Sequence, residues 1–195
     1  MKRNHFTSLL QFMRRWDSVA APLTCSEPGN RISRGGRINL EGSETCSAAR
    51  TYTRWDTEFV EVIEPGVRRL VLTLVEKFDC ITYSSCEGHP EPPNGGTVTV
   101  RHVGILPRDS GEYEDLIQTV RGVAAECNRQ IPGRGARVSV VERTLSSEDI
   151  EAPCFEILFE REGSGWPAYF NHLEEVYGLF LDQLIEEAEN RTTRS

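Results

Sequence analysis

The sequence predicts an α+β domain in which helices cover a four-stranded, mainly antiparallel sheet. Two stretches with apolar residues at helical spacing are each followed by two strand-like stretches, and a third amphipathic stretch closes the chain. Consecutive strands with short connections pair antiparallel, which is typical of α+β rather than α/β folds. The 195 residues suffice for one large core, which we expect at 55–195, after a separate region at 1–54.

The first helix–strand–strand unit begins at Pro65, because proline in the first turn of a helix costs no hydrogen bond. The apolar residues after it share one helical face: Val67, Leu70, Val71, Leu74, Val75 and Phe78. Short strands are expected at 80–85 and 97–106. The connection between them is rich in glycine and proline, so we expect no regular structure there.

The second unit begins with a capping box, since Asp109 is followed three residues later by Glu112. Strands are expected at 137–143 and at 154–161, where apolar and polar residues alternate. A last amphipathic helix follows Pro167 and is expected to cover the sheet.

The two units suggest an internal duplication. One short match supports this: "TYSS" at 82–85 and "TLSS" at 144–147 both close the first strand of a unit. Only the first copy continues with a cysteine, a glycine and a histidine. The sequence therefore points to the first copy as the one that carries a site.

The region 1–54 differs from the rest of the chain in charge and composition. It carries nine basic and four acidic groups, whereas the remaining residues carry 13 basic and 26 acidic groups. Five apolar residues share a helical face near its start: Phe6, Leu9, Leu10, Met13 and Trp16. We expect a helix that docks on the domain or on a partner, followed at 20–53 by a partly disordered basic arm. An anionic nucleic acid or a protein partner could order this arm, and a transit peptide is an alternative reading of the helix.

Composition also excludes several classes. A net charge of −8 argues against a general nucleic-acid coat protein, and the sequence holds no apolar run long enough to cross a membrane. Six cysteines without a secretory signal favour reduced thiols rather than a disulfide framework. We therefore expect a cytoplasmic protein without a membrane partner.

The candidate site lies in the stretch "CITYSSCEGHP". Cys86 follows a strand, Gly88 allows a ligand to approach the backbone, and His89 lies near enough to share a site with the thiol. The imidazole could lower the pKa of the thiol or act as acid or base near neutral pH. Ser84 and Ser85 can form hydrogen bonds through their hydroxyl groups.

Two alternatives stay open at this loop. Cys86 could be a small buried side chain beside a surface histidine. The loop could also bind zinc, because cysteine and histidine are zinc ligands and four of them fall in the first unit: Cys80, Cys86, His89 and His102. The set lacks the paired Cys-x-x-Cys spacing of strong zinc motifs.

The alternation of side chains along a strand predicts which face of the sheet each residue after the loop occupies. It places His102 on the same face as Val98 and Val100, which we expect to be the buried face, so His102 is either a core histidine or a group that reaches the site. Arg101 then points the other way, into solvent or toward an anion.

The residues Thr82, Ser84, Ser85, Cys86 and Gly88 resemble the Thr-x-Ser-Ser-Cys-x-Gly signature of the wybutosine-synthesis methyltransferases, which modify tRNA. The likeness extends over about residues 78–141. It implies S-adenosylmethionine as cofactor, a modified guanosine as substrate, and ligand contacts at Ser84, Ser85 and Cys86. The sequence departs from the pattern at His89, where the family has an arginine, and the acidic body suits tRNA poorly.

Two functions follow from these observations. The first is a small-molecule or nucleoside site with Cys86 as nucleophile or ligand contact and His89 as acid or base, in a methyltransferase-like or thiol-dependent enzyme. The second is a non-catalytic binding or assembly subunit that contacts a protein or nucleic acid through its basic arm. In that case the cysteine loop is structural or binds zinc.

Overall fold

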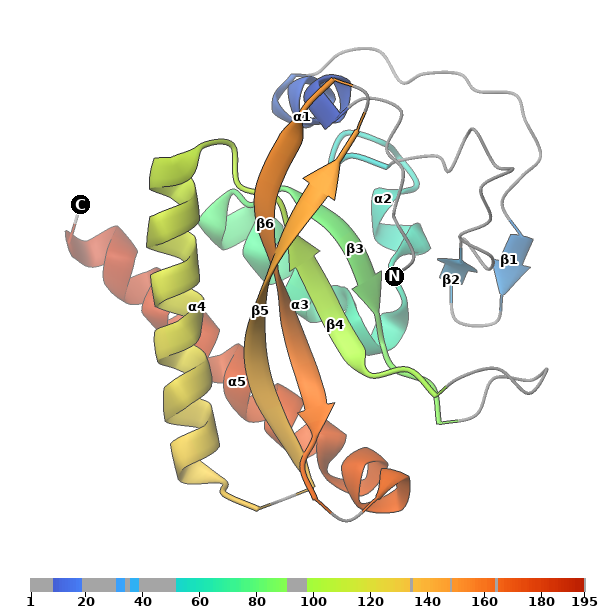
Figure 1. The fold of residues 1–195 in the computed structure, drawn as a ribbon, viewed down its shortest axis with the longest axis vertical. Coiled ribbons are helices and arrows are strands. Elements are labelled where there is room, and N and C mark those ends of the chain that lie inside the picture. Colours follow the sequence, from blue (N-terminus) through green and yellow to red (C-terminus); the bar gives the residue numbers. More distant parts are fainter. Residues whose placement is uncertain are drawn as a thin grey trace.

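In the computed structural model, residues 9–18, 31–33, 36–38, 52–90, 98–133, 135–147, 149–163 and 165–194 are described. Figure 1 shows a sheet backed by long helices, with smaller elements at one side. The elements follow in the order α1 (Leu9–Asp17), β1 (Arg31–Ser33), β2 (Gly36–Ile38), α2 (Phe59–Val62), α3 (Pro65–Phe78), β3 (Thr82–Cys86), β4 (Arg101–Ile105), α4 (Ser110–Gln130), β5 (Ala136–Ser146), β6 (Glu151–Arg161) and α5 (Trp166–Arg194).

The main sheet confirms the predicted fold class. Its strand order is β3-β4-β6-β5, and all three neighbouring pairs are antiparallel. The first strand of each unit lies at an edge, and the second strands pair at the centre. The matching segments do not fall at the same point of the two edge strands, since Thr82 begins β3 whereas Thr144 lies near the end of β5.

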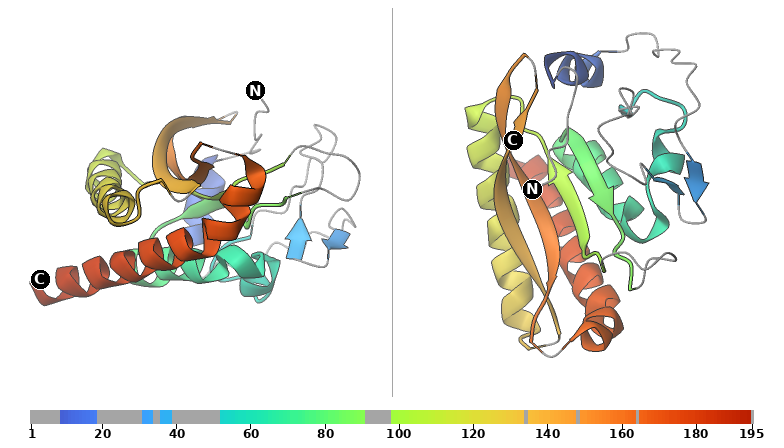
Figure 2. Two further views of the ribbon diagram at one scale, coloured as in Figure 1. Left: turned by 90° about the horizontal axis from the view of Figure 1, so that it is seen from below. Right: turned by 45° about the vertical axis from the view of Figure 1, so that its right-hand side comes forward.

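The helices α3, α4 and α5 pack on one face of this sheet (Figure 2). The ring of Phe159 on β6 contacts the rings of Tyr177 and Phe180 on α5, with centroids 5.6 Å apart in each pair. On α4, Tyr113 meets Phe155 edge to face. Burial of these apolar side chains is the main stabilising contribution to the fold.

The helix starts are those that the sequence predicts. α3 begins at Pro65, and it ends where Asp79 adopts a left-handed conformation with φ of 54°. At the start of α4, the carboxylate of Asp109 accepts a hydrogen bond of 2.8 Å from the backbone N–H of Glu112. This bond satisfies one of the free N–H groups of the first turn.

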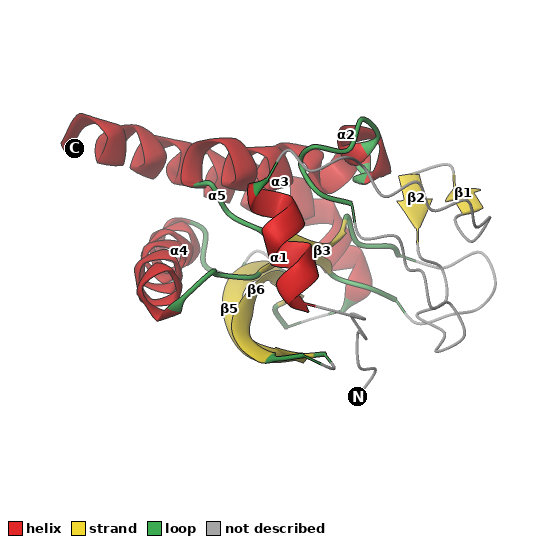
Figure 3. Ribbon diagram, turned by 90° about the horizontal axis from the view of Figure 1, so that it is seen from above, coloured by secondary structure: helices red, strands yellow, loops and turns green. Residues whose placement is uncertain are grey.

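The helix α1 packs against the end of the sheet next to the connection between β5 and β6 (Figure 3). Its side chains Leu9, Phe12 and Trp16 are buried and belong to the main hydrophobic core. The backbone N–H groups of Leu9 and Leu10 donate to the carboxylate of Asp149, at 3.1 and 3.2 Å. The apolar face of α1 therefore contacts the domain itself.

The expected arm at 20–53 lies largely outside the described residues. Within it, β1 and β2 form a short antiparallel pair where we expected no regular structure. No helix in the described part of the chain is long and apolar enough to cross a membrane.

Candidate functional site

The candidate loop continues the ladder between β3 and β4. Beyond Cys86, the backbones of His89 and Thr99 exchange two hydrogen bonds of 3.1 and 3.2 Å. Gly88 has a φ of 83°, and a Cβ atom at this position would lie 2.9 Å from the backbone nitrogen of Arg101. Glycine is therefore required for the turn that holds the imidazole close to the thiol.

A carboxylate from another part of the chain completes the site. Ligand atoms of Glu64, Cys86 and His89 all lie within 4.8 Å of one another. His89 Nε2 lies 3.1 Å from Glu64 Oε1, and the side chain of Glu64 is only 7% exposed, against 34% for His89. Glu64 was not predicted from the sequence, where its only signal is its place immediately before a proline that opens a helix.

Backbone groups fix the orientation of Glu64. Its Oε2 atom accepts the N–H of Glu87 at 2.7 Å, while the carboxylate of Glu87 accepts the N–H of Gly66 at 2.8 Å. These two bonds join the end of β3 to the start of α3. They leave Oε1 of Glu64 directed at His89.

The sulfur of Cys86 has two polar neighbours. It accepts a hydrogen bond of 3.4 Å from the N–H of Gly88 and lies 3.6 Å from Oγ1 of Thr99. Burial, together with the charge of Glu64, raises the pKa of the Cys86 thiol. The expected lowering of this pKa is therefore not found, and the surroundings oppose a free thiolate nucleophile at neutral pH.

The four-residue zinc set expected from the sequence does not come together. Cys80 is fully buried before β3 begins, and its sulfur contacts the carbonyl of Phe78. His102 directs Nε2 at the hydroxyl of Ser84, at 3.2 Å. Of the expected set, only Cys86 and His89 share a cluster, and Glu64 is its third member.

The expected orientations of Arg101 and His102 are reversed. Arg101 is 3% exposed and lies among the helices, where its guanidinium forms an ion pair with Glu174 at 2.5 Å and stacks on the ring of Tyr177 at 4.4 Å. His102 is only half-buried and pairs with Leu158 in the sheet. We expected Arg101 to meet solvent or an anion, whereas its guanidinium is bound by Glu174 and Tyr177 of the same chain.

The hydroxyl residues of β3 divide between the two faces of the sheet. Thr82 is buried and pairs with Ile105, and Ser85 pairs with the buried Val103. A bulge lies between Thr82 and Ser84. Of the two serines implied by the family resemblance, Ser84 contacts His102, which is also the register partner of Cys86.

The side chain of Tyr83, which was not singled out from the sequence, also lies on β3. The ring of Tyr83 occupies the space above Gly104, where a Cβ atom would lie 2.5 Å from it. Its hydroxyl donates to the carboxylate of Glu156 at 3.2 Å. The glycine in the centre of β4 is the only signal in the sequence for this close approach.

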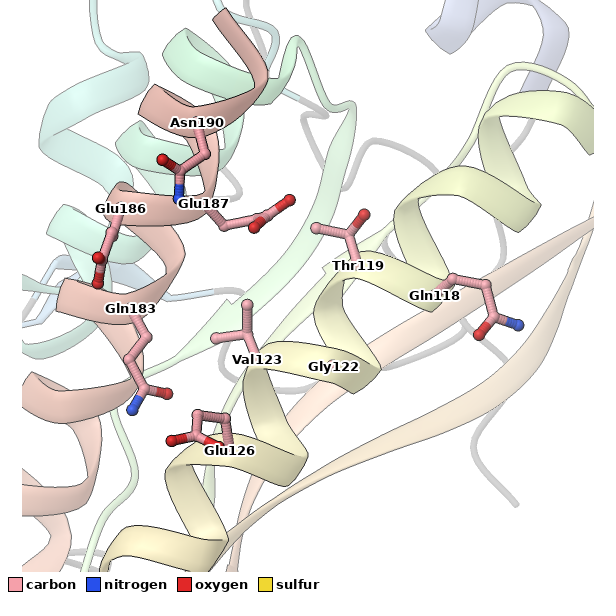
Figure 4. A pocket seen from close by; sticks show the side chains of 9 residues that line it. All are labelled: Gln118, Thr119, Gly122, Val123, Glu126, Gln183, Glu186, Glu187 and Asn190. Atoms are coloured by element: carbon pink, nitrogen blue, oxygen red, sulfur yellow. The ribbon is translucent and has the colours of Figure 1, made fainter. Parts of the chain in front are cut away.

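Two surface hollows lie away from the cluster. One of about 390 Å³ runs between α4 and α5, and Figure 4 shows the side chains that line it. The other, of about 410 Å³, lies along the outer side of α3. Neither is lined by Glu64, Cys86 or His89.

Comparisons with models of protein families, with curated proteins and with solved structures found no match to this chain.

Proposed function

We propose that the chain binds a small polar molecule at Glu64, Cys86 and His89 and that this cluster is its reactive site. The observation that carries the proposal is the convergence of a carboxylate, a thiol and an imidazole within 4.8 Å, from two separate parts of the sequence. Groups of these three types in one place are typical of binding and catalytic sites.

The state of His89 supports this role. A buried carboxylate next to Nε2 favours the tautomer that carries its proton on that atom, which leaves Nδ1 as a hydrogen-bond acceptor. At 34% exposure, the His89 side chain is held in place and still accessible from solvent. It can therefore accept a proton or a hydrogen bond from a bound molecule.

The neighbours of the cluster supply further polar groups. His102 is the register partner of Cys86 and contacts the hydroxyl of Ser84, and Thr99 lies beside the sulfur. Hydroxyl and imidazole groups of this kind recognise the hydrogen-bonding edges of a nucleoside-sized ligand. The resemblance to the wybutosine-synthesis methyltransferases also favours a nucleoside and S-adenosylmethionine as the first ligands to test.

The test measures binding of S-adenosylmethionine and of guanosine by isothermal titration calorimetry. We expect Cys86→Ala and His89→Ala each to weaken binding by at least about tenfold, the loss typical of a hydrogen bond to a ligand. His172→Ala is the matched control, because His172 on α5 bonds only to the carbonyl of Ala168 in the described contacts.

Native mass spectrometry of the purified chain extends the test to other ligands. A small molecule that co-purifies with the wild type and is lost from Cys86→Ala would support the site. The proposal is overturned if both probes fail to bind and no molecule co-purifies, or if the two variants bind as the wild type does.

A further inference from the structure

We propose that Glu64, Cys86 and His89 together bind a zinc ion and leave one coordination position open. This inference rests on the proposed function, since it uses the same cluster, and it states how the cluster would act on a bound molecule. Among the described residues, these three form the one group of side chains whose ligand atoms lie close enough to hold a metal ion.

The distances suit a tetrahedral ion. Zinc ligands lie about 2.0–2.3 Å from the metal, so two ligands of one ion are separated by about 3.3–3.8 Å. The separation of 3.1 Å between His89 Nε2 and Glu64 Oε1 is close to this range, and the ion would replace the proton that Nε2 carries when no metal is bound. The largest separation in the cluster is below 4.8 Å, so a movement of about 1 Å would bring all three atoms to one ion.

Hydrogen bonds from neighbouring groups orient the three ligand residues, as is common for metal ligands. Glu64 is fixed through Oε2 by the N–H of Glu87, which leaves Oε1 available. The sulfur of Cys86 accepts the N–H of Gly88, and such a bond stabilises a metal-bound thiolate. The backbone N–H of His89 is bonded to Thr99 Oγ1 at 3.1 Å.

The charges around the cluster favour a cation. Glu64 brings a carboxylate into a buried place, and metal binding would add the negative charge of the Cys86 thiolate, so the two charges together need a positive partner. The buried guanidinium of Arg101 is engaged by the carboxylate of Glu174 and the carbonyl of Glu87. A divalent ion would supply the missing positive charge.

The types of donor select zinc among the common divalent ions. Magnesium and calcium prefer oxygen ligands alone, whereas one sulfur, one nitrogen and one oxygen suit zinc. Three protein ligands are the number found in catalytic zinc sites, in which water or substrate takes the fourth position. Structural zinc sites use four, so this set points to a site that binds a molecule.

The first experiment measures zinc in the full chain, purified under reducing conditions without a histidine tag, by inductively coupled plasma mass spectrometry. We expect stoichiometric zinc in the wild type and in the controls Glu61→Gln and His172→Ala. The affinity for zinc should fall by at least about tenfold in Glu64→Gln, Cys86→Ser and His89→Ala, so these variants should retain less zinc than the wild type. Glu64→Gln keeps an acceptor for the N–H of Glu87, so a loss of zinc in this variant is not explained by unfolding.

Replacement of zinc by cobalt(II) gives a second readout. A thiolate bound to cobalt(II) produces a charge-transfer band in the near ultraviolet, which we expect in the wild type and in His172→Ala but not in Cys86→Ser. The inference is overturned if the wild type holds no zinc and shows no such band, or if Cys86→Ser retains both. Nucleoside binding without a metal would overturn this inference alone, whereas zinc without any bound small molecule would contradict the proposed function alone.

Discussion

Glu64 and His89 are separated by 25 residues of sequence, and their side chains meet at 3.1 Å. The contact joins the start of α3 to the loop after β3, and the second oxygen of Glu64 strengthens that junction by accepting the N–H of Glu87. The pair thus lies on the boundary between a helix and a sheet, where both backbones are held by the core.

Removal of the Glu64 carboxylate should destabilise the fold. In Glu64→Ala, the N–H of Glu87 and the imidazole of His89 both lose their acceptor, and hydrogen bonds to charged groups contribute about 1.5–3 kcal/mol each. We expect the free energy of unfolding in urea to fall by about 3 kcal/mol or more. Glu61→Ala, an exposed change one turn earlier, should stay within about 0.5 kcal/mol. Equal stability of the two variants would contradict the described role of Glu64.

Two glycines should respond to alanine in opposite directions. Gly88→Ala places a Cβ atom 2.9 Å from a backbone nitrogen at a φ of 83°, which should cost about 1–3 kcal/mol of stability. Gly122→Ala lies within α4 with no atom within 4 Å of the new Cβ, so it should gain up to about 1 kcal/mol. Thermal unfolding of both variants checks the pair, and a stabilised Gly88→Ala would show that the turn is not held in this conformation.

Asp149 should control the docking of α1. Its carboxylate accepts the first N–H groups of that helix, an interaction with an N-terminus that contributes about 1 kcal/mol. We expect Asp149→Ala to increase hydrogen exchange in α1 while the exchange of β6 stays unchanged. Asp182→Ala, at an exposed position on α5, is the control. Unaltered exchange of α1 in Asp149→Ala would mean that this carboxylate does not hold the helix.

Buried thiols should make stability depend on alkaline pH. Burial raises the pKa of Cys127 from 9.0 to about 11, so the folded chain keeps this proton at a pH where the unfolded chain has lost it. The resulting contribution to the free energy of unfolding is complete below pH 9 and is lost as the pH rises toward 11. Urea unfolding of the wild type and of Cys127→Ala between pH 8 and 11 measures it. The two curves should differ in slope within this window, and parallel curves would exclude the effect.

The elements of the fold could be predicted because their signals are local. Pro65 and Asp109 mark helix starts through the chemistry of the first turn, and both helices begin where these residues place them. The two faces of β4 were assigned wrongly because the alternation was counted from Val98 and Val100. These two residues precede the strand, whereas Val103 and Ile105 lie within it and set the buried face.

Part of the candidate site could also be predicted, for the same reason. Cys86 and His89 are close in sequence, and a glycine between them marks a turn that brings them together. Glu64 reaches them only through the packing of α3 beside β3, a long-range contact that its place before the first proline of α3 does not predict. Cys80 and His102 have suitable side chains, but the path of the chain takes the first into the core and the second toward Ser84.

X-ray absorption spectroscopy at the zinc edge tests most directly whether the three side chains form one centre. We expect a single sulfur at about 2.3 Å from the zinc ion, with the remaining ligands nitrogen or oxygen at about 2.0–2.1 Å. In Cys86→Ser the sulfur contribution should vanish. A zinc ion without sulfur in the wild type, or with two sulfurs, would contradict a centre made of Glu64, Cys86 and His89.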